Sequence, residues 1–231
     1  MICALIVAAG KGTRMGPGTD KLFLDLNGLP VVGHTWRTFD SAECVEQIVL
    51  VVRDGAEPEF EKLAAQLSLK KKFQLVPGGK ERQDSVWKGL EALPSKTQIV
   101  AIQDAARPCA TAALIAATVE AAQETGAAVA AQPVTDTIKE SADGNLIERT
   151  LDRSRLWAVQ TPQTFRVEII RRALGEVRRR GLSITDDTAA CELIGQPVRL
   201  VHSNEPNPKV TTPADLPFIA GLLRRIGPIN P

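Results

Sequence analysis

The chain alternates between short, continuously apolar runs and longer stretches with the periodicity of amphipathic helices. Apolar runs without polar alternation are typical of strands with both faces buried, which occur in parallel sheets covered by helices on both sides. The expected strands cover residues 3–9, 47–53, 73–77, 98–104 and 127–134. The expected helices between them cover residues 31–41, 57–67, 82–93 and 111–123. This pattern predicts an α/β fold with a mostly parallel central sheet.

Residues 135–153 break this alternation. Polar and apolar residues alternate around the letters ADGN, which is typical of a β-hairpin. A lone two-stranded hairpin is marginal in water unless it packs on another surface. We therefore expect an arm that leaves the main domain and contacts a partner subunit. Beyond it the patterns predict two helices, a strand and a last helix, at 167–181, 186–195, 198–202 and 212–226 respectively.

The composition bounds both the architecture and the class of function. With 231 residues that are 44% hydrophobic, the chain can bury one sizeable core, so residues 1–231 are expected to form a single domain that includes the arm. Lys and Arg number 28 against 27 Asp and Glu, so the basic excess typical of a nucleic-acid-binding domain is missing. No apolar run approaches the roughly 20 residues that span a membrane. The first residues do not resemble a signal peptide. We expect a cytoplasmic protein without nucleic-acid or membrane partners.

The rarer side chains exclude further chemistry. The four cysteines include no CxxC pair, which argues against a zinc cluster or a disulfide framework. The two histidines are interpreted as structural, so Ser-His-Asp or Cys-His catalysis is not expected.

A glycine-rich loop with cations follows the first expected strand, in the letters AAGKGTRMGPGTDK from Ala8 to Lys21. Its glycines do not have the GxGxxG spacing of a dinucleotide fingerprint, and the GxxxxGK[ST] spacing of a P-loop is also missing. An ordinary strand-to-helix turn would not explain the cations Lys11, Arg14 and Lys21. We expect the loop to wrap a triphosphate, because glycines let backbone N–H groups close around phosphate oxygens. Arg14 and Lys21 would then neutralise the leaving phosphates.

Two more expected strands end in candidate ligands. Asp104 ends the strand at 98–104 and is a candidate Mg²⁺ ligand, because Mg²⁺ typically takes one or two carboxylates plus phosphate oxygens. The alternative is that Asp104 caps the next helix. Gly78, Gly79 and Ser85 follow the strand at 73–77 and indicate a close approach of the backbone to a base or ribose. Arg107 either orients the turn after Asp104 or contacts phosphate.

The second half of the chain adds further candidates for phosphate binding. Lys209 stands between two prolines, so its backbone is stiff, although an exposed loop lysine is the simpler interpretation. Thr185 stands at an expected helix N-cap, where anions bind readily. The remaining candidates are Arg153, Arg155 and Thr161.

Seven motifs taken together resemble one family. They are, in order, AAGKGTRMG…DK, GGKERQDSV, DAARP, PVTDTIK, LDRSRLW…QTPQTF, ITDDTAA and NPKVTTPAD, and they cover nearly the whole chain. The ordered set is similar to that of the 2-C-methyl-D-erythritol 4-phosphate cytidylyltransferases of the non-mevalonate isoprenoid pathway. The resemblance implies a Rossmann-like nucleotidyltransferase fold, a homodimer, and CTP and methylerythritol phosphate as substrates with Mg²⁺ as cofactor.

The resemblance also implies roles for individual residues. Arg14 and Lys21 match contacts to the CTP triphosphate, Lys209 matches a lysine near the α-phosphate, and Asp104 matches the metal-binding aspartate. The nucleotide-binding positions are Ala8, Ala9, Gly10, Gly79, Ser85 and Ala105. The positions that hold methylerythritol phosphate are Thr137, Arg153, Thr161 and Thr185, of which the first two reach in from the partner's arm.

Two residues depart from the family pattern. Lys80 stands where an acid is common, so contacts to the base at that turn are expected to differ. Phe23 stands where a tyrosine is frequent. Neither departure affects the expected phosphate chemistry.

The implied reaction is an in-line attack of a substrate phosphate oxygen on the α-phosphorus of CTP, with pyrophosphate leaving. The nucleophile is already ionised at neutral pH, so catalysis needs positioning and charge stabilisation rather than a general base. One alternative is a ribitol 5-phosphate cytidylyltransferase, although DAARP favours methylerythritol over the DSVRP-like turn of that branch. The other is a nucleotide sensor without activity, which predicts the loss of Arg14, Lys21 or Asp104.

Overall fold

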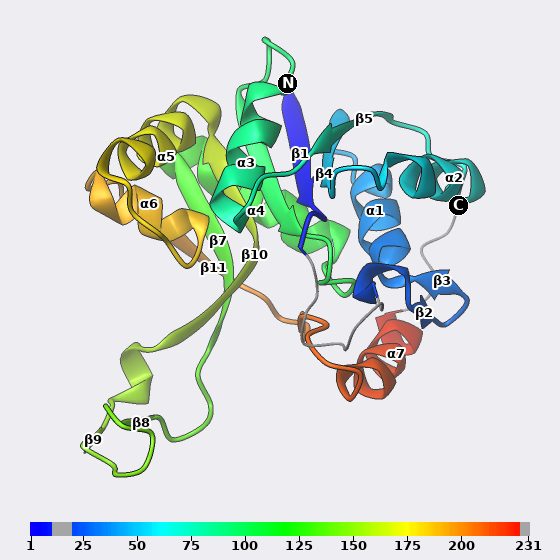
Figure 1. The fold of residues 1–231 in the computed structure, drawn as a ribbon. Helices are drawn as coiled ribbons and strands as arrows, with labels where there is room; N and C mark the ends of the chain where they lie inside the picture. Colours follow the sequence, from blue (N-terminus) through cyan, green and yellow to red (C-terminus); the bar gives the residue numbers. More distant parts are fainter. Residues whose placement is uncertain (11–19, 227–231) are drawn as a thin grey trace.

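The computed structural model of the protein describes residues 1–10 and 20–226. Its centre is a sheet with the strand order β11-β7-β10-β6-β1-β4-β5 (Figure 1). The strands span Ile2–Val7 (β1), Gln47–Val52 (β4), Lys72–Pro77 (β5), Ile99–Asp104 (β6), Ala127–Pro133 (β7), Trp157–Arg166 (β10) and Arg199–His202 (β11). Strands β4 and β6 run parallel to β1, β5 runs parallel to β4, and β11 runs parallel to β7. Strand β10 runs antiparallel to both β6 and β7. The predicted α/β fold with a mostly parallel sheet is confirmed.

Helices cover both faces of this sheet. They span Val31–Ser41 (α1), Glu57–Leu67 (α2), Arg82–Glu91 (α3), Ala112–Thr125 (α4), Val167–Arg180 (α5), Asp187–Leu193 (α6) and Asp215–Ile226 (α7). Side chains of α1, α2, α4 and α7 form one core cluster with the sheet, and those of α3, α5 and α6 form another. Strand β1 lies between the two clusters: Ile6 packs in the first and Leu5 in the second, both without exposed surface. Its position explains why this run contains no polar residue.

The strand β10 was not predicted from the sequence. Pro162 stands in its middle, and a proline argues against an interior strand because it has no N–H for the ladder. The register of β10 against β7 shifts between Val159 and Gln163, so the strand passes the proline at an irregularity. Beyond the shift it pairs regularly with β6 as well. Several of its buried residues are polar, among them Gln160, Thr161 and Gln163.

The hairpin arm is present. The outer parts of β7 and β10 continue away from the domain into residues 134–156, and the arm projects clear of the sheet (Figure 1). Its own strands are short, since β8 (Lys139–Glu140) and β9 (Arg149–Thr150) form a single two-residue ladder. The arm ends in a short 3-10 helix, η3 (Arg153–Arg155), before β10 begins.

Two other short elements lie beside the sheet. The 3-10 helix η2 (Lys21–Phe23) is followed by the small hairpin of β2 (Asp25–Leu26) and β3 (Leu29–Pro30).

Within the described residues no helix has the length and hydropathy of a membrane span.

Candidate active site

The carboxyl ends of four parallel strands enclose the larger of two neighbouring cavities, with a volume of about 600 Å³. We call it the first pocket. The pocket is lined by Lys21, Lys209 and six predicted nucleotide-binding residues. The six lie on the loops after β1, β5 and β6 or, for Ser85, in the first turn of α3, and they are Ala8, Ala9, Gly10, Gly79, Ser85 and Ala105. Ligands of open parallel sheets bind at such strand ends. Arg14, the remaining predicted triphosphate contact, lies outside the described residues.

The turn after β5 is held by its own packing. A Cβ at Gly78 would lie 2.3 Å from the Cβ of Ala9, and a Cβ at Gly79 would lie 2.3 Å from that of Asp84. The Ser85 hydroxyl accepts a hydrogen bond from the Gly79 N–H and donates one to the Glu81 carbonyl, both at 3.1 Å. The glycines are therefore required by the fold itself, and the Ser85 hydroxyl shapes the wall of the pocket.

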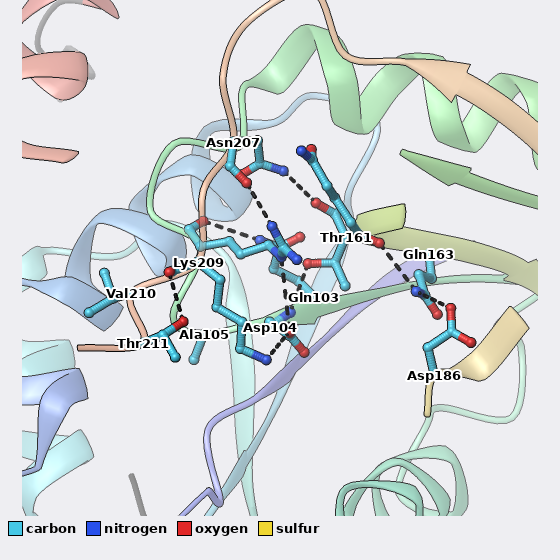
Figure 2. Close-up of polar contacts among 12 residues, drawn as sticks. Gln103, Asp104, Ala105, Thr161, Gln163, Asp186, Asn207, Lys209, Val210 and Thr211 are labelled. Atoms are coloured by element: carbon cyan, nitrogen blue, oxygen red, sulfur yellow. Dashed lines mark hydrogen bonds and ion pairs between the residues drawn. The ribbon is translucent and has the colours of Figure 1, made fainter. Parts of the chain in front are cut away.

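Asp104, at the end of β6, is surrounded by cations. Its Oδ2 accepts from Lys209 Nζ at 2.6 Å, its Oδ1 accepts from Arg82 Nε at 3.1 Å, and Arg107 Nε lies 4.0 Å away (Figure 2 draws the bond to Lys209). Burial would raise the pKa of this carboxyl, but the charges of Arg82 and Lys209 outweigh burial and hold the pKa well below its usual range. Asp104 is therefore an ionised carboxylate that faces the pocket.

Asp104 does not cap the next helix, which was the alternative interpretation. The N-cap of α4 is Thr111, whose side chain accepts from the Leu114 N–H at 3.1 Å. The turn between Asp104 and Thr111 is instead tied to the segment that carries Lys209. Arg107 donates to the carbonyl of Asn207 at 2.7 Å, which favours the orienting role for Arg107.

Lys209 is placed by its neighbours along the chain. The Val210 N–H donates to the Ala106 carbonyl at 2.8 Å, which docks this segment on the turn after β6. The Val210 carbonyl accepts from Lys21 Nζ at 3.0 Å, so Lys21 and Lys209 reach the same pocket from opposite ends of the chain. Lys209 is thus an ordered side chain rather than a free loop lysine.

Lys21 begins the 3-10 helix η2, and its position depends on two residues that sequence reasoning missed. Asp20 caps this helix by accepting from the Leu22 N–H at 3.0 Å, and its other oxygen pairs with Arg53 at the end of β4. Asp20 belongs to the first of the seven motifs but was given no role there, and Arg53 belongs to no recognisable motif.

A second pocket, with a volume of about 490 Å³, lies beside the first. The predicted residues Thr161 and Thr185 line it, and Asp104, Lys209 and Arg82 line both pockets. The Thr161 hydroxyl accepts from the backbone N–H of Asp104 at 3.1 Å, so this side chain joins the second pocket to the carboxylate (Figure 2).

The start of α6 forms the far wall of the second pocket. The expected helix N-cap was Thr185, but this prediction was wrong by one residue. The cap is Asp186, which accepts from the Ala189 N–H at 3.0 Å. Thr185 precedes the cap and lines the cavity. Gln163 of β10 donates to Asp186 at 2.9 Å (Figure 2) and anchors this wall to the sheet.

Thr137 and Arg153 are not brought to either pocket within one chain. Both lie on the arm, and neither is among the described residues that line the two cavities. Arg153 donates instead to the Thr135 carbonyl at the base of the arm. The prediction that they hold the substrate from a partner's arm stays a prediction.

The carboxylate of Asp104 suits a metal ion that takes its other ligands from phosphate oxygens. Among the described residues no group of three His, Cys, Asp or Glu side chains could form a metal cage of protein ligands. One strand-end carboxylate that is held ionised and lines the first pocket fits the way Mg²⁺ is usually bound. Asp104 is the residue that would hold it.

Comparison with known proteins identifies the family. The family model for 2-C-methyl-D-erythritol 4-phosphate cytidylyltransferase matches residues 2–225. A protein of that name from Pelotomaculum thermopropionicum is 43% identical over 224 residues, covering 96% of this chain and 94% of the relative. The crystal structure of 4-diphosphocytidyl-2C-methyl-D-erythritol synthase from Anaerococcus prevotii matches with a TM-score of 0.85 at 27% identity, covering 97% of this chain and 98% of the other.

The cytidylyltransferase from Thermus thermophilus matches with a TM-score of 0.78 at 32% identity, over 95% of this chain and 98% of the other. These matches confirm the family and the nucleotidyltransferase fold that the ordered motifs indicated. The chain belongs to the 2-C-methyl-D-erythritol 4-phosphate cytidylyltransferase family and is a nucleotidyltransferase.

Proposed function

We propose that the two pockets serve one reaction: the first pocket binds CTP and the second pocket binds the polyol phosphate. The chain transfers the cytidylyl group of CTP to 2-C-methyl-D-erythritol 4-phosphate in isoprenoid biosynthesis. The products are 4-diphosphocytidyl-2-C-methyl-D-erythritol and pyrophosphate. This assignment of the two substrates to the two pockets is supported by one observation: Asp104 and Lys209, in contact at 2.6 Å, line both cavities. The reacting phosphates would meet there.

The chain's own groups act by placing and neutralising charge. The substrate phosphate is already a nucleophile at neutral pH, so no side chain needs to remove a proton. Lys209 lies where the α-phosphate is transferred, and Lys21 and Arg14 would hold the leaving pyrophosphate. Positioned cations stabilise negative charge that grows in a transition state. Mg²⁺, held by Asp104, would add further positive charge on the CTP phosphates.

We further propose that the working unit is a homodimer in which each arm completes the partner's second pocket. Thr137 and Arg153 would then contact the methylerythritol phosphate across the interface. The arm exposes Leu146 (73%) and Ile147 (65%), and it has no core of its own to bury them. Exposed apolar side chains on a projecting hairpin favour a docked partner. We also propose a cytoplasmic location, as expected from the sequence.

The test is pyrophosphate release with Mg²⁺. CTP would be paired with methylerythritol 4-phosphate or ribitol 5-phosphate, with UTP as the control nucleotide. Release only with CTP and methylerythritol phosphate is expected. Release only with ribitol phosphate would keep the mechanism and change the pathway. No release from folded protein with either acceptor would favour the nucleotide sensor.

A further inference from the structure

Arg82 lies between the two pockets and has no part in the reaction described above. It is the first residue of α3, directly after the turn that forms a wall of the first pocket. Its Nε donates to Asp104 at 3.1 Å, and its terminal NH2 lies 2.9 Å from a carboxylate oxygen of Asp187. One guanidinium thus bridges the end of β6 and the start of α6.

Asp187 is fully buried at the first position of α6. Among the described residues its carboxylate oxygens have no partner with hydrogen-bond geometry, and its ion pair is with Arg82. A buried carboxylate is costly unless it is paired. The carboxylate of Asp187 is paired with the guanidinium of Arg82, and the guanidinium in turn contacts Asp104.

The residue after Arg82 strengthens the same connection. The Gln83 side chain donates to the Leu182 carbonyl and accepts from the Ile184 N–H, both at 3.0 Å. Residues 182–184 lead directly to Thr185 on the wall of the second pocket. Two adjacent side chains therefore attach the start of α3 to this region, Arg82 to the first residue of α6 and Gln83 to the loop before it.

We propose that Arg82, anchored by Asp187, is a positioning residue that fixes Asp104. It couples the wall of the first pocket, where we place CTP, to the wall of the second pocket, where we place the acceptor phosphate. This inference rests on the proposed function, because it concerns the same site. A planar guanidinium can meet two carboxylates at once, whereas an ammonium group is a single point charge. The second pocket is bordered by Asp104 at one end of this bridge and by the start of α6, which carries Asp187, at the other. Loss of Asp187 is therefore expected to affect acceptor binding more than CTP binding.

The first variant is Asp187→Asn, which keeps the size of the side chain and leaves Arg82 paired with Asp104. We expect the KM for methylerythritol phosphate to rise about 10-fold, because misplacement of a positioned group weakens productive binding. The Kd for CTP, measured by calorimetric titration, should change by less than about two-fold, because Arg82 keeps its contact with Asp104 and Asp187 does not line the first pocket. The matched control is the exposed ion pair of Arg199 and Glu124, for which Glu124→Gln should leave both constants unchanged.

The decisive measurement is a double-variant cycle with Arg82→Gln and Asp187→Asn. If Asp187 acts only through Arg82, the double variant loses no more than Arg82→Gln alone, in acceptor KM and in thermal stability. Losses that multiply, or wild-type constants in Asp187→Asn, would overturn the proposal. Should Arg82→Gln fail to fold, Arg82→Lys takes its place, since it keeps the charge but not the bridge. Wild-type protein that releases no pyrophosphate would refute the proposed function instead, and the thermal-unfolding cycle would still test the coupling.

Discussion

The first pocket and the arm differ in how the chain holds their functional side chains. In the pocket, Asp104 is fixed by a buried strand, by two close cations and by a backbone hydrogen bond to Thr161. On the arm, Thr137 and Arg153 stand on exposed backbone with one short ladder nearby. One chain is therefore sufficient to build the charge cluster but not to place the arm residues. The difference teaches that, if the arm residues belong to the active site as we propose, a second subunit must bring them there.

The largest expected effect concerns stability. Phe165 is completely buried in β10, two residues after Gln163, which lines the second pocket. Phe165→Ala should lower the free energy of unfolding by about 3–5 kcal/mol, because it removes apolar contacts and leaves a cavity. Denaturant unfolding measures this. Leu146→Ala on the arm should change it by less than about 0.5 kcal/mol, and equal losses would mean that the arm belongs to the cooperative core.

The next effect concerns catalysis within the pocket. Lys209→Ala should reduce kcat by about 100-fold, which corresponds to roughly 3 kcal/mol of transition-state stabilisation. Pyrophosphate release under saturating CTP is the measurement. Lys96→Ala, an exposed lysine before β6, is the control and should keep wild-type turnover. Wild-type turnover in Lys209→Ala would show that its contact with Asp104 has no catalytic consequence.

A mixing experiment tests whether the arm works across subunits. Lys209→Ala lacks a pocket cation and Arg153→Ala lacks an arm contact, so a mixed dimer would contain one site with both defects and one intact site. After subunit exchange at equal concentrations, activity should recover to about a quarter of wild type. Lys209→Ala mixed with Asp104→Asn should not recover, since both changes lie in the same pocket. Failure of the first mixture to recover would show that the arm serves its own chain or none.

The smallest effect compares two exposed ion pairs, one in each region. Hydrogen bonds from Arg179 and Arg180 lower the pKa of Glu176 on α5 to about 2. A hydrogen bond from Arg149 lowers the pKa of Glu140 on the arm. A depressed folded pKa stabilises the protein fully above the unfolded value of about 4.3, and this stabilisation is lost as pH falls through the folded value.

Glu176→Gln should therefore weaken the pH dependence of the free energy of unfolding between about pH 4 and pH 2. The change should be slight, because exposed ion pairs are screened by solvent. Glu140→Gln should not change it, since the arm has no core whose unfolding it could affect. Thermal melts across this pH range at low salt compare the two. A response in Glu140→Gln as large as that in Glu176→Gln would remove the distinction between the regions.

Much of the fold was predictable because its signals are local. The helices at Val31–Ser41 and Glu57–Leu67 have the predicted bounds, and the apolar runs became strands of the sheet. The expected burial of both faces was wrong for the run at 73–77, because β5 lies at the edge of the sheet and is largely exposed. Asp104 was recognisable because it ends an apolar run. Strand β10 was hidden by Pro162, since a proline removes a ladder donor and only the irregular register against β7 accommodates it.

Local pattern alone established the alternating α/β architecture, the arm and strand-end residues of the first pocket such as Asp104 and Gly79, because apolar periodicity and strand ends can be read from neighbouring residues. The predicted alanines that line this pocket were assigned by the family resemblance. The tertiary structure decided which distant charges meet. Arg82 and Asp187 stand far apart in the sequence, and each resembles an ordinary charged residue at the start of a helix. Only the order of the strands and the packing of α3 and α6 bring them to 2.9 Å, where burial makes their pairing obligatory.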